Sequence, residues 1–105
     1  ALTPDLLAKH GVGYMCDWVN DDMPYLFRTG AGPIVAMPLS LELEDAFVIH
    51  GNLHSEAEWA EQVRDAFDVL YAEAAEQGGR ILALSLHPWV LGQPHRIGRL
   101  EEVLE

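Results

Sequence analysis

The chain has 105 residues, of which half are hydrophobic, and its 17 Asp and Glu against 6 Lys and Arg give a formal net charge of −11 at pH 7. This composition can bury a core, and it excludes an intrinsically disordered chain. The acidity argues against nucleic acid and anionic membrane surfaces as partners, because both need clustered cations. No apolar run approaches a membrane span, and Cys16 alone cannot form an intrachain disulfide. We therefore expect a reducing, cytoplasmic setting.

The N-terminal third reads as one helix and two short strands. Thr3-Pro4-Asp5 has the residue types of a helix start, and Gly11 suits its end. A strand is expected from Gly13 to Trp18. The stretch 20–28 is expected to be irregular because its aspartates and proline disfavour a strand, and residues 33–38 form a second strand bounded by prolines.

The clearest element is a helix over residues 55–77. Ser55 and Glu58 have the spacing of a capping box, and Gly78-Gly79 suit the helix end. Apolar residues recur at spacings of three and four, which predicts one buried face opposite an acidic, solvated face. The apolar positions are Trp59, Val63, Phe67, Leu70, Tyr71 and Ala74.

Residues 80–86 are almost continuously apolar, and we expect them to form a strand. A strand without alternation is typically buried on both faces, as in a parallel sheet with outer helices. A last helix is expected from about Ile97. The order of these elements predicts an α/β fold with parallel strands and outer helices.

Two polar groups follow predicted strands at their carboxyl ends, where parallel α/β folds place ligands and catalytic groups. Asp17-Trp18 ends the first strand, and His87 follows the apolar run 80–86. A histidine in such a place is either a catalytic or binding group or a structural hydrogen-bonding group.

Two further residue pairs have side chains that can bind metals, and for each pair we favour a structural role. His50 and His54 have a spacing that on a helix would put two imidazoles on one face for a metal, but Gly51 and Asn52 disfavour a helix. We therefore favour a loop that leads into the helix cap. Asp21-Asp22 is read as a surface turn rather than as a divalent-cation ligand pair.

Two segments together resemble the polysaccharide deacetylase (NodB-like) family, and most closely its allantoinase-like branch. They are Cys16-Asp17-Trp18-Val19-Asn20-Asp21-Asp22-Met23-Pro24-Tyr25 and Ser85-Leu86-His87-Pro88-Trp89-Val90-Leu91-Gly92-Gln93-Pro94-His95-Arg96. The stretch from Phe47 to Glu58 fits that branch as well. The resemblance covers nearly the whole chain.

The resemblance implies that residues 1–105 are the C-terminal half of a distorted (β/α) barrel. On the family pattern the chain lacks the segment with the metal-binding or base aspartate, the paired-histidine motif, the arginine motif and the last barrel strand. His50 and His54 stand in the wrong order to replace the paired histidines. We therefore expect no metal or other cofactor within this chain, whereas a full-length relative would be able to use a divalent metal.

The resemblance also assigns candidate site residues. His87 matches the catalytic histidine that protonates the departing amine, and Asp17 matches the segment that orients it. The expected substrate-binding residues are Trp18, Trp89, His95 and Arg96. Pro88 stands where many deacetylases have aspartate, which favours the allantoinase-like branch over a carbohydrate substrate.

Three functions follow as hypotheses. In the first, the chain is part of a hydrolase of non-peptide carbon–nitrogen (amide) bonds. The complete enzyme would act on a small amide or N-acetyl substrate, and the chain alone would be inactive. The second is a truncated half-domain that acts as a non-enzymatic oligomeric or binding module, because a half-barrel leaves unpaired strand edges. It would associate with itself or with a missing half. The third is a metal-binding module through His50, His54 and an acidic residue.

Overall fold

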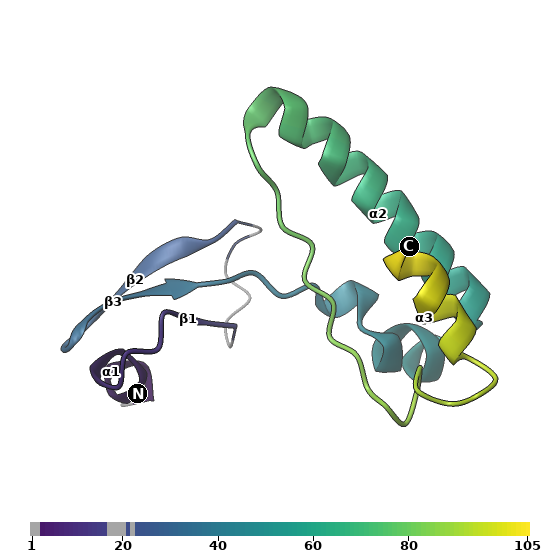
Figure 1. The fold of residues 1–105 in the computed structure, drawn as a ribbon, viewed down its shortest axis with the longest axis horizontal. Coiled ribbons are helices and arrows are strands. Elements are labelled where there is room, and N and C mark those ends of the chain that lie inside the picture. Colours follow the sequence, from purple (N-terminus) through teal and green to yellow (C-terminus); the bar gives the residue numbers. More distant parts are fainter. Residues whose placement is uncertain (1–2, 17–20, 22) are drawn as a thin grey trace. The chain divides into compact units, whose positions relative to one another are not determined.

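The computed structural model describes residues 3–16, 21 and 23–105. They divide into two compact units, Ala1–Leu39 and Ser40–Glu105. Figure 1 shows the helices and strands of each unit.

The first unit is a helix and a small mixed sheet. Helix α1 spans Thr3–Lys9, and strands β1 (Tyr14–Met15), β2 (Tyr25–Thr29) and β3 (Gly32–Ala36) form a sheet in the order β1-β3-β2. β1 pairs with β3 in parallel, whereas β2 pairs with β3 as an antiparallel hairpin. The expected helix and second strand are therefore present, whereas the first expected strand is confined to Tyr14–Met15 among the described residues, and its end at positions 17 and 18 lies outside them.

Strand β2 shows that the expectation of irregular structure over 20–28 was wrong from Tyr25 onward. Every residue of β2 lies opposite a residue of β3, with Thr29 across from Gly32 at the turn. Pairing with β3 supplies the backbone hydrogen bonds that decide the strand, and this overrides the weak local preference. The expected all-parallel strand arrangement is accordingly wrong for this sheet.

The second unit is mainly helical. It contains a 3-10 helix η1 (Leu41–Leu43), a π-helix η2 (Ala46–Gly51) and the α-helices α2 (Glu56–Gln77) and α3 (Ile97–Leu104). Its core joins η2, the start of α2 and the turns at Val90 and Leu91 around the fully buried Trp59. The Trp59 indole N–H donates to the carbonyl oxygen of Leu43 at 2.9 Å, which ties α2 to η1.

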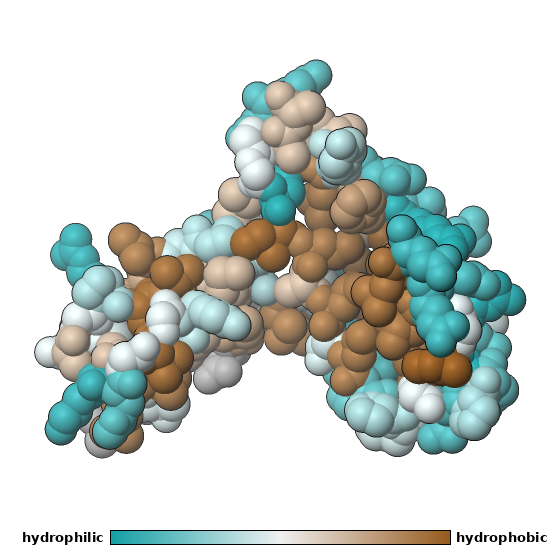
Figure 2. All heavy atoms as spheres, viewed as in Figure 1, coloured by the Kyte–Doolittle hydropathy of each residue, from teal (hydrophilic) through white to brown (hydrophobic). Residues whose placement is uncertain are grey.

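Helix α2 begins and ends as the sequence predicts. The Ser55 hydroxyl accepts from the Glu58 amide at 3.1 Å, and the Glu58 carboxylate accepts from the Ser55 amide at 3.1 Å. These two bonds form the predicted capping box and satisfy two amides that the helix leaves unpaired. Figure 2 shows the hydrophilic outer side of this helix beside the hydrophobic residues that it covers.

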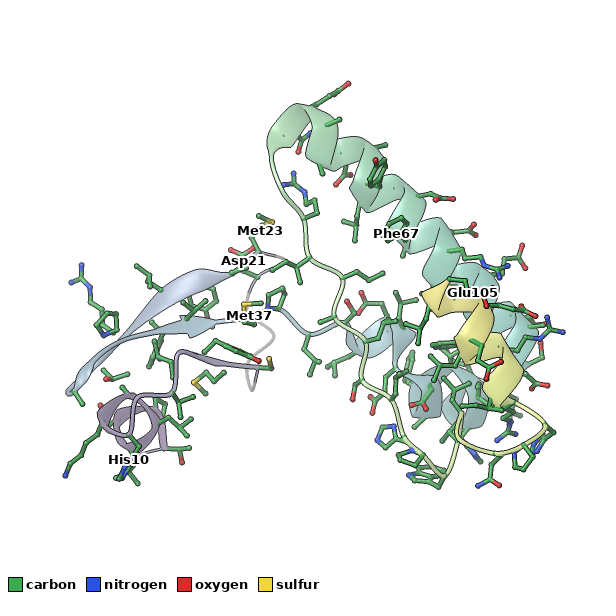
Figure 3. The ribbon with its side chains drawn as sticks, in the orientation of Figure 1. His10, Asp21, Met23, Met37, Phe67 and Glu105 are labelled. Atoms are coloured by element: carbon green, nitrogen blue, oxygen red, sulfur yellow. The ribbon has the colours of Figure 1, made fainter. Side chains whose placement is uncertain are left out.

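The predicted apolar face of α2 is buried only near its start. Val63 is buried with Trp59, whereas Phe67 and Tyr71 are 54% and 72% exposed. Both line a shallow groove of about 110 Å³ with Leu82, and Figure 3 labels Phe67 on this helix. The second half of the face therefore has little cover within the described part of the chain.

The predicted strand over 80–86 is wrong for this structure. The segment has no strand pairing within the described residues, and Figure 1 draws it as a long irregular stretch between α2 and the turns that follow. Apolar sequence alone does not make a strand, because a strand needs a neighbouring backbone to pair with.

Candidate active site

The candidate site is built around His87, where the apolar segment meets the turns of 88–96. Asp45 lies between η1 and η2 and is fully buried. Its carboxylate accepts from the His87 backbone N–H at 2.8 Å, from the His87 Nδ1 at 2.7 Å and from the Ala46 N–H at 2.8 Å. These bonds fix both the backbone and the ring of His87, since a carboxylate accepts and the Nδ1 must donate.

The second ring nitrogen of His87 has a looser neighbour. Glu44 Oε1 lies 3.4 Å from His87 Nε2, which is longer than the 2.7–2.9 Å typical of a charge-assisted bond. The side chains of His87 and Glu44 are 31% and 25% exposed. The His87 ring is thus held tightly at Nδ1 by Asp45, is partly exposed as a whole, and has a looser contact at Nε2.

The two acidic neighbours favour the charged form of the ring. The hydrogen bond to Asp45 is the largest cause of a raised His87 pKa, and the charges of Asp45 and Glu44 raise it further against partial desolvation. A raised pKa keeps the imidazole protonated at a higher pH than its usual 6.5.

Aromatic rings flank the same histidine. The Trp89 ring meets His87 edge-on, with the ring centroids 5.6 Å apart, and lies 5.0 Å from the ring of His50. Trp89 is 55% exposed, so it forms an accessible wall beside His87. His50 lies in the last turn of η2, so the expected loop is wrong for His50, whereas His54 lies in the irregular stretch that leads to the cap of α2, as expected.

The remaining predicted residues divide into three groups. Arg96 is engaged within the unit, because its Nη1 donates to the Val90 carbonyl at 3.4 Å and its Nε lies 3.8 Å from Glu56. His95 is exposed in the turn before α3. Asp17 and Trp18 lie outside the described residues.

Sequence reasoning missed Asp45 as the partner of His87. Asp45 stands in a stretch rich in acids, where a solvated side chain is the usual expectation. A local signal was its place before an apolar helical turn, where aspartate commonly caps, and the Asp45 side chain does accept from Ala46 N–H. The bond to a residue 42 positions away leaves no local pattern.

The described residues offer no metal centre. They contain no group of three or more His, Cys, Asp or Glu side chains arranged to hold an ion. His54 Nδ1 instead contacts the Gln62 amide at 2.9 Å, and His50 contacts Trp89. The donor set of the described residues does not fit the divalent metal implied for full-length relatives. Nor does any described helix have the length and apolar character of a membrane span.

No protein-family model matches the chain. A Schizosaccharomyces pombe protein described as a polysaccharide deacetylase is 29% identical over 99 residues, covering 85% of this chain and 31% of that protein. The solved structure of the Puue allantoinase matches with a TM-score of 0.79 and 32% identity, over 98% of this chain and 35% of the other. A structure described as a polysaccharide deacetylase from Pseudomonas aeruginosa PAO1 gives a TM-score of 0.79 and 30% identity over the same shares.

The chain resembles part of a polysaccharide-deacetylase-type (NodB-like) domain, as predicted. A third such structure, from Mycobacterium smegmatis, agrees with a TM-score of 0.75 and 28% identity. The chain spans about a third of the length of these relatives. The NodB-like resemblance therefore concerns a portion of the domain, with a small mixed sheet and helices.

Proposed function

We propose that this chain is the C-terminal portion of a NodB-like domain and supplies the leaving-group acid of a hydrolase for non-peptide carbon–nitrogen bonds. The names of its relatives, an allantoinase and polysaccharide deacetylases, describe enzymes of amide-type bonds. The observation that carries the proposal is the buried Asp45 bonded to the Nδ1 of a partly exposed His87.

The geometry suits an acid that gives up its proton at one atom. With Nδ1 bonded to Asp45, the transferable proton of the imidazolium is the one on Nε2. Its contact with Glu44 at 3.4 Å is long enough to be exchanged for a substrate nitrogen. The raised His87 pKa maintains the protonated form that a general acid requires.

In the proposed reaction, water activated by a base in the rest of the protein attacks the amide carbon. The carbon–nitrogen bond then breaks, and its electron pair leaves with the nitrogen. His87 donates the Nε2 proton to that nitrogen, so the amine departs neutral. Asp45 holds the ring in place during the transfer and stabilises the imidazolium beforehand.

The substrate side of the proposal rests on Trp89. Its exposed indole beside His87 offers a flat apolar wall for a small planar amide. Arg96 is a weaker candidate for substrate recognition, because its guanidinium already contacts Val90 and Glu56. His95, Asp17 and Trp18 remain predicted site residues.

The chain alone is expected to have little or no activity. A base for water and a group that stabilises the carbonyl oxygen are also needed, and the chain spans about a third of its relatives. The purified chain is assayed on allantoin and on N-acetylated sugars. Turnover that His87→Ala abolishes would show that the chain is catalytically complete, against this expectation.

A chimera tests the role of His87 itself. The matching segment of the Puue allantoinase is replaced by this chain, and hydrolysis of allantoin is measured. Loss of a general acid should lower kcat by about 10²- to 10⁴-fold in His87→Ala. His54→Ala is the matched control, because His54 is an exposed histidine that contacts Gln62. An active chimera that tolerates His87→Ala would refute the proposed role.

A further inference from the structure

Glu44 lies beside the nitrogen of His87 that gives up its proton, and the proposed reaction assigns it no step. Its Oε1 is 3.4 Å from His87 Nε2, and its side chain is 25% exposed. Among the described residues, His87 is the ion-pair partner of this carboxylate. A carboxylate accepts several hydrogen bonds. Glu44 therefore has acceptor capacity next to the place where the leaving nitrogen must lie.

The backbone of Glu44 is fixed, although its carboxylate is loosely held. Its N–H donates to the Leu41 carbonyl at 3.2 Å, and its carbonyl accepts from the Val48 N–H at 3.0 Å. These bonds hold the residue between η1 and η2, directly before the buried Asp45. The fold thus places Glu44 at the site, while its long and partly exposed side chain is able to rotate.

A single nitrogen can contact both His87 Nε2 and Glu44. Hydrogen bonds to these two atoms would each be about 2.9 Å long. Two such bonds that meet at a tetrahedral nitrogen separate their outer atoms by about 4.7 Å, whereas Nε2 and Oε1 are 3.4 Å apart. An outward rotation of the Glu44 side chain makes this room. Asp45 stays in place meanwhile, because three hydrogen bonds hold it.

We propose that Glu44 is a specificity-determining residue whose carboxylate accepts a hydrogen bond from an N–H group on the leaving nitrogen. The inference deepens the proposed function and rests on it. The preferred substrates are then amides that carry a hydrogen on this nitrogen. Amides with two alkyl groups on the nitrogen cannot donate to Glu44 and are poor substrates.

The assignment keeps the proton balance of the reaction. After water has added to the amide carbon, the nitrogen has a lone pair and an N–H group. The lone pair takes the Nε2 proton of His87 as the carbon–nitrogen bond breaks, while the N–H group still donates to Glu44. The amine leaves with both hydrogens, and the charge of Glu44 does not change.

The charges of the site favour the nitrogen end of the amide near Glu44. Two carboxylates, Asp45 and Glu44, flank one imidazole. The carbonyl oxygen gains negative charge during the reaction and is repelled by a carboxylate, whereas an N–H group is attracted. The nitrogen therefore faces Nε2 and Glu44, and the carbonyl oxygen points away from them. The plane of the amide can lie against the exposed ring of Trp89.

Binding of two small amides to the purified 105-residue chain tests this preference without turnover. N-methylacetamide has an N–H group, whereas N,N-dimethylacetamide has none. Both are titrated while the NMR signals of the His87 ring and the Glu44 carboxylate are followed. N-methylacetamide should bind about threefold to tenfold more tightly, as expected for one hydrogen bond in a partly exposed site. Equal affinities, including binding of neither amide, would overturn the proposal.

A pair of variants tests whether the preference comes from Glu44. Glu44→Met keeps an unbranched side chain and removes the carboxylate, so the two amides should bind with equal affinity. Glu42→Met is the matched control, because Glu42 is exposed in the same short helix η1 and should keep the wild-type preference. A preference that survives in Glu44→Met would refute the assignment. If this variant fails to fold, the wild-type Glu44 carboxylate signal decides, since only N-methylacetamide should shift it.

Kinetics in the chimera with the Puue allantoinase separate this inference from the role of His87. Glu44→Met should lower the ratio of kcat/KM between allantoin and an analogue methylated at the leaving nitrogen by about threefold to tenfold. His87→Ala should reduce turnover of both compounds. An unchanged ratio together with an inactive His87→Ala chimera would refute Glu44 alone. A lowered ratio together with an active His87→Ala chimera would refute the general acid and keep the N–H contact.

Discussion

Replacing Asp45 with asparagine tests whether this buried carboxylate holds the site together. The carboxylate accepts three bonds at 2.7–2.8 Å, from the Ala46 amide, the His87 amide and His87 Nδ1. An asparagine of the same shape keeps one acceptor oxygen and replaces the other with a donating NH₂ group. If the oxygen stays toward Ala46 and the ring, the NH₂ group faces the His87 amide. In the flipped orientation, the NH₂ group instead faces two donors, the Ala46 amide and His87 Nδ1.

The expected loss of unfolding free energy follows from the number of buried N–H groups that lose their acceptor. A buried N–H without a partner costs about 1–3 kcal/mol. One backbone amide is affected in Asp45→Asn, so the free energy of unfolding should fall by about 2 kcal/mol. Asp45→Ala removes the acceptor for both backbone amides and should cost about 2–5 kcal/mol.

The assay is urea unfolding followed by tryptophan fluorescence, with an NMR titration of the His87 ring. Asp68→Asn is the control, since Asp68 is exposed on α2 and its replacement should change stability by no more than about 0.5 kcal/mol. The His87 pKa should fall in Asp45→Asn because its largest raising cause is lost. A variant with the wild-type urea midpoint and the wild-type His87 pKa would refute the reasoning.

Three further predictions concern the same unit. Because the folded state raises the His87 pKa, the proton-linked stability is complete below pH 6.5 and is lost as the pH rises through the higher folded pKa. Urea midpoints should therefore decline over that range in the wild type but not in His87→Gln. Gly92→Ala should destabilise the chain by about 1–3 kcal/mol, because its Cβ would lie 2.4 Å from the Pro88 oxygen. Gly98→Ala, with open space around it, should be neutral or stabilising when both variants are compared by urea unfolding. Trp59→Phe should cost about 2 kcal/mol in urea unfolding, because a buried carbonyl 2.9 Å from the indole N–H loses its donor.

Local signals were sufficient for the α-helices, whereas the short helices η1 and η2 were not predicted. Ser55 and Glu58 lie three residues apart and bond to each other, so the start of α2 can be read from its own sequence. The last helix was expected from Ile97 and begins there. Capping and helical periodicity involve residues within a turn or two of each other. They can therefore be predicted without knowledge of the rest of the fold.

Strands were less predictable because their partners are remote or missing. β2 forms where the sequence favoured irregular structure, because β3 pairs with it residue by residue. Ile81–Leu86 shows the reverse case, since an apolar run with inward-facing Leu82 and Leu84 has no backbone partner in the described chain. Sequence composition indicates which segments are able to be strands, whereas the neighbouring backbone decides which of them are.

The site shows the same division between local and remote information. His87 could be singled out because it follows the apolar run 80–86, at what was expected to be the carboxyl end of a strand. The partner itself depended on the path of the chain between η1 and η2, which buries Asp45 completely while Glu44, one residue earlier, stays partly exposed. The two acids are adjacent in sequence, yet one bonds Nδ1 at 2.7 Å and the other lies 3.4 Å from Nε2. The proposed proton donation from Nε2 rests on this asymmetry, because Asp45 orients the ring through Nδ1 and the longer contact of Nε2 with Glu44 is easier to exchange for a substrate atom.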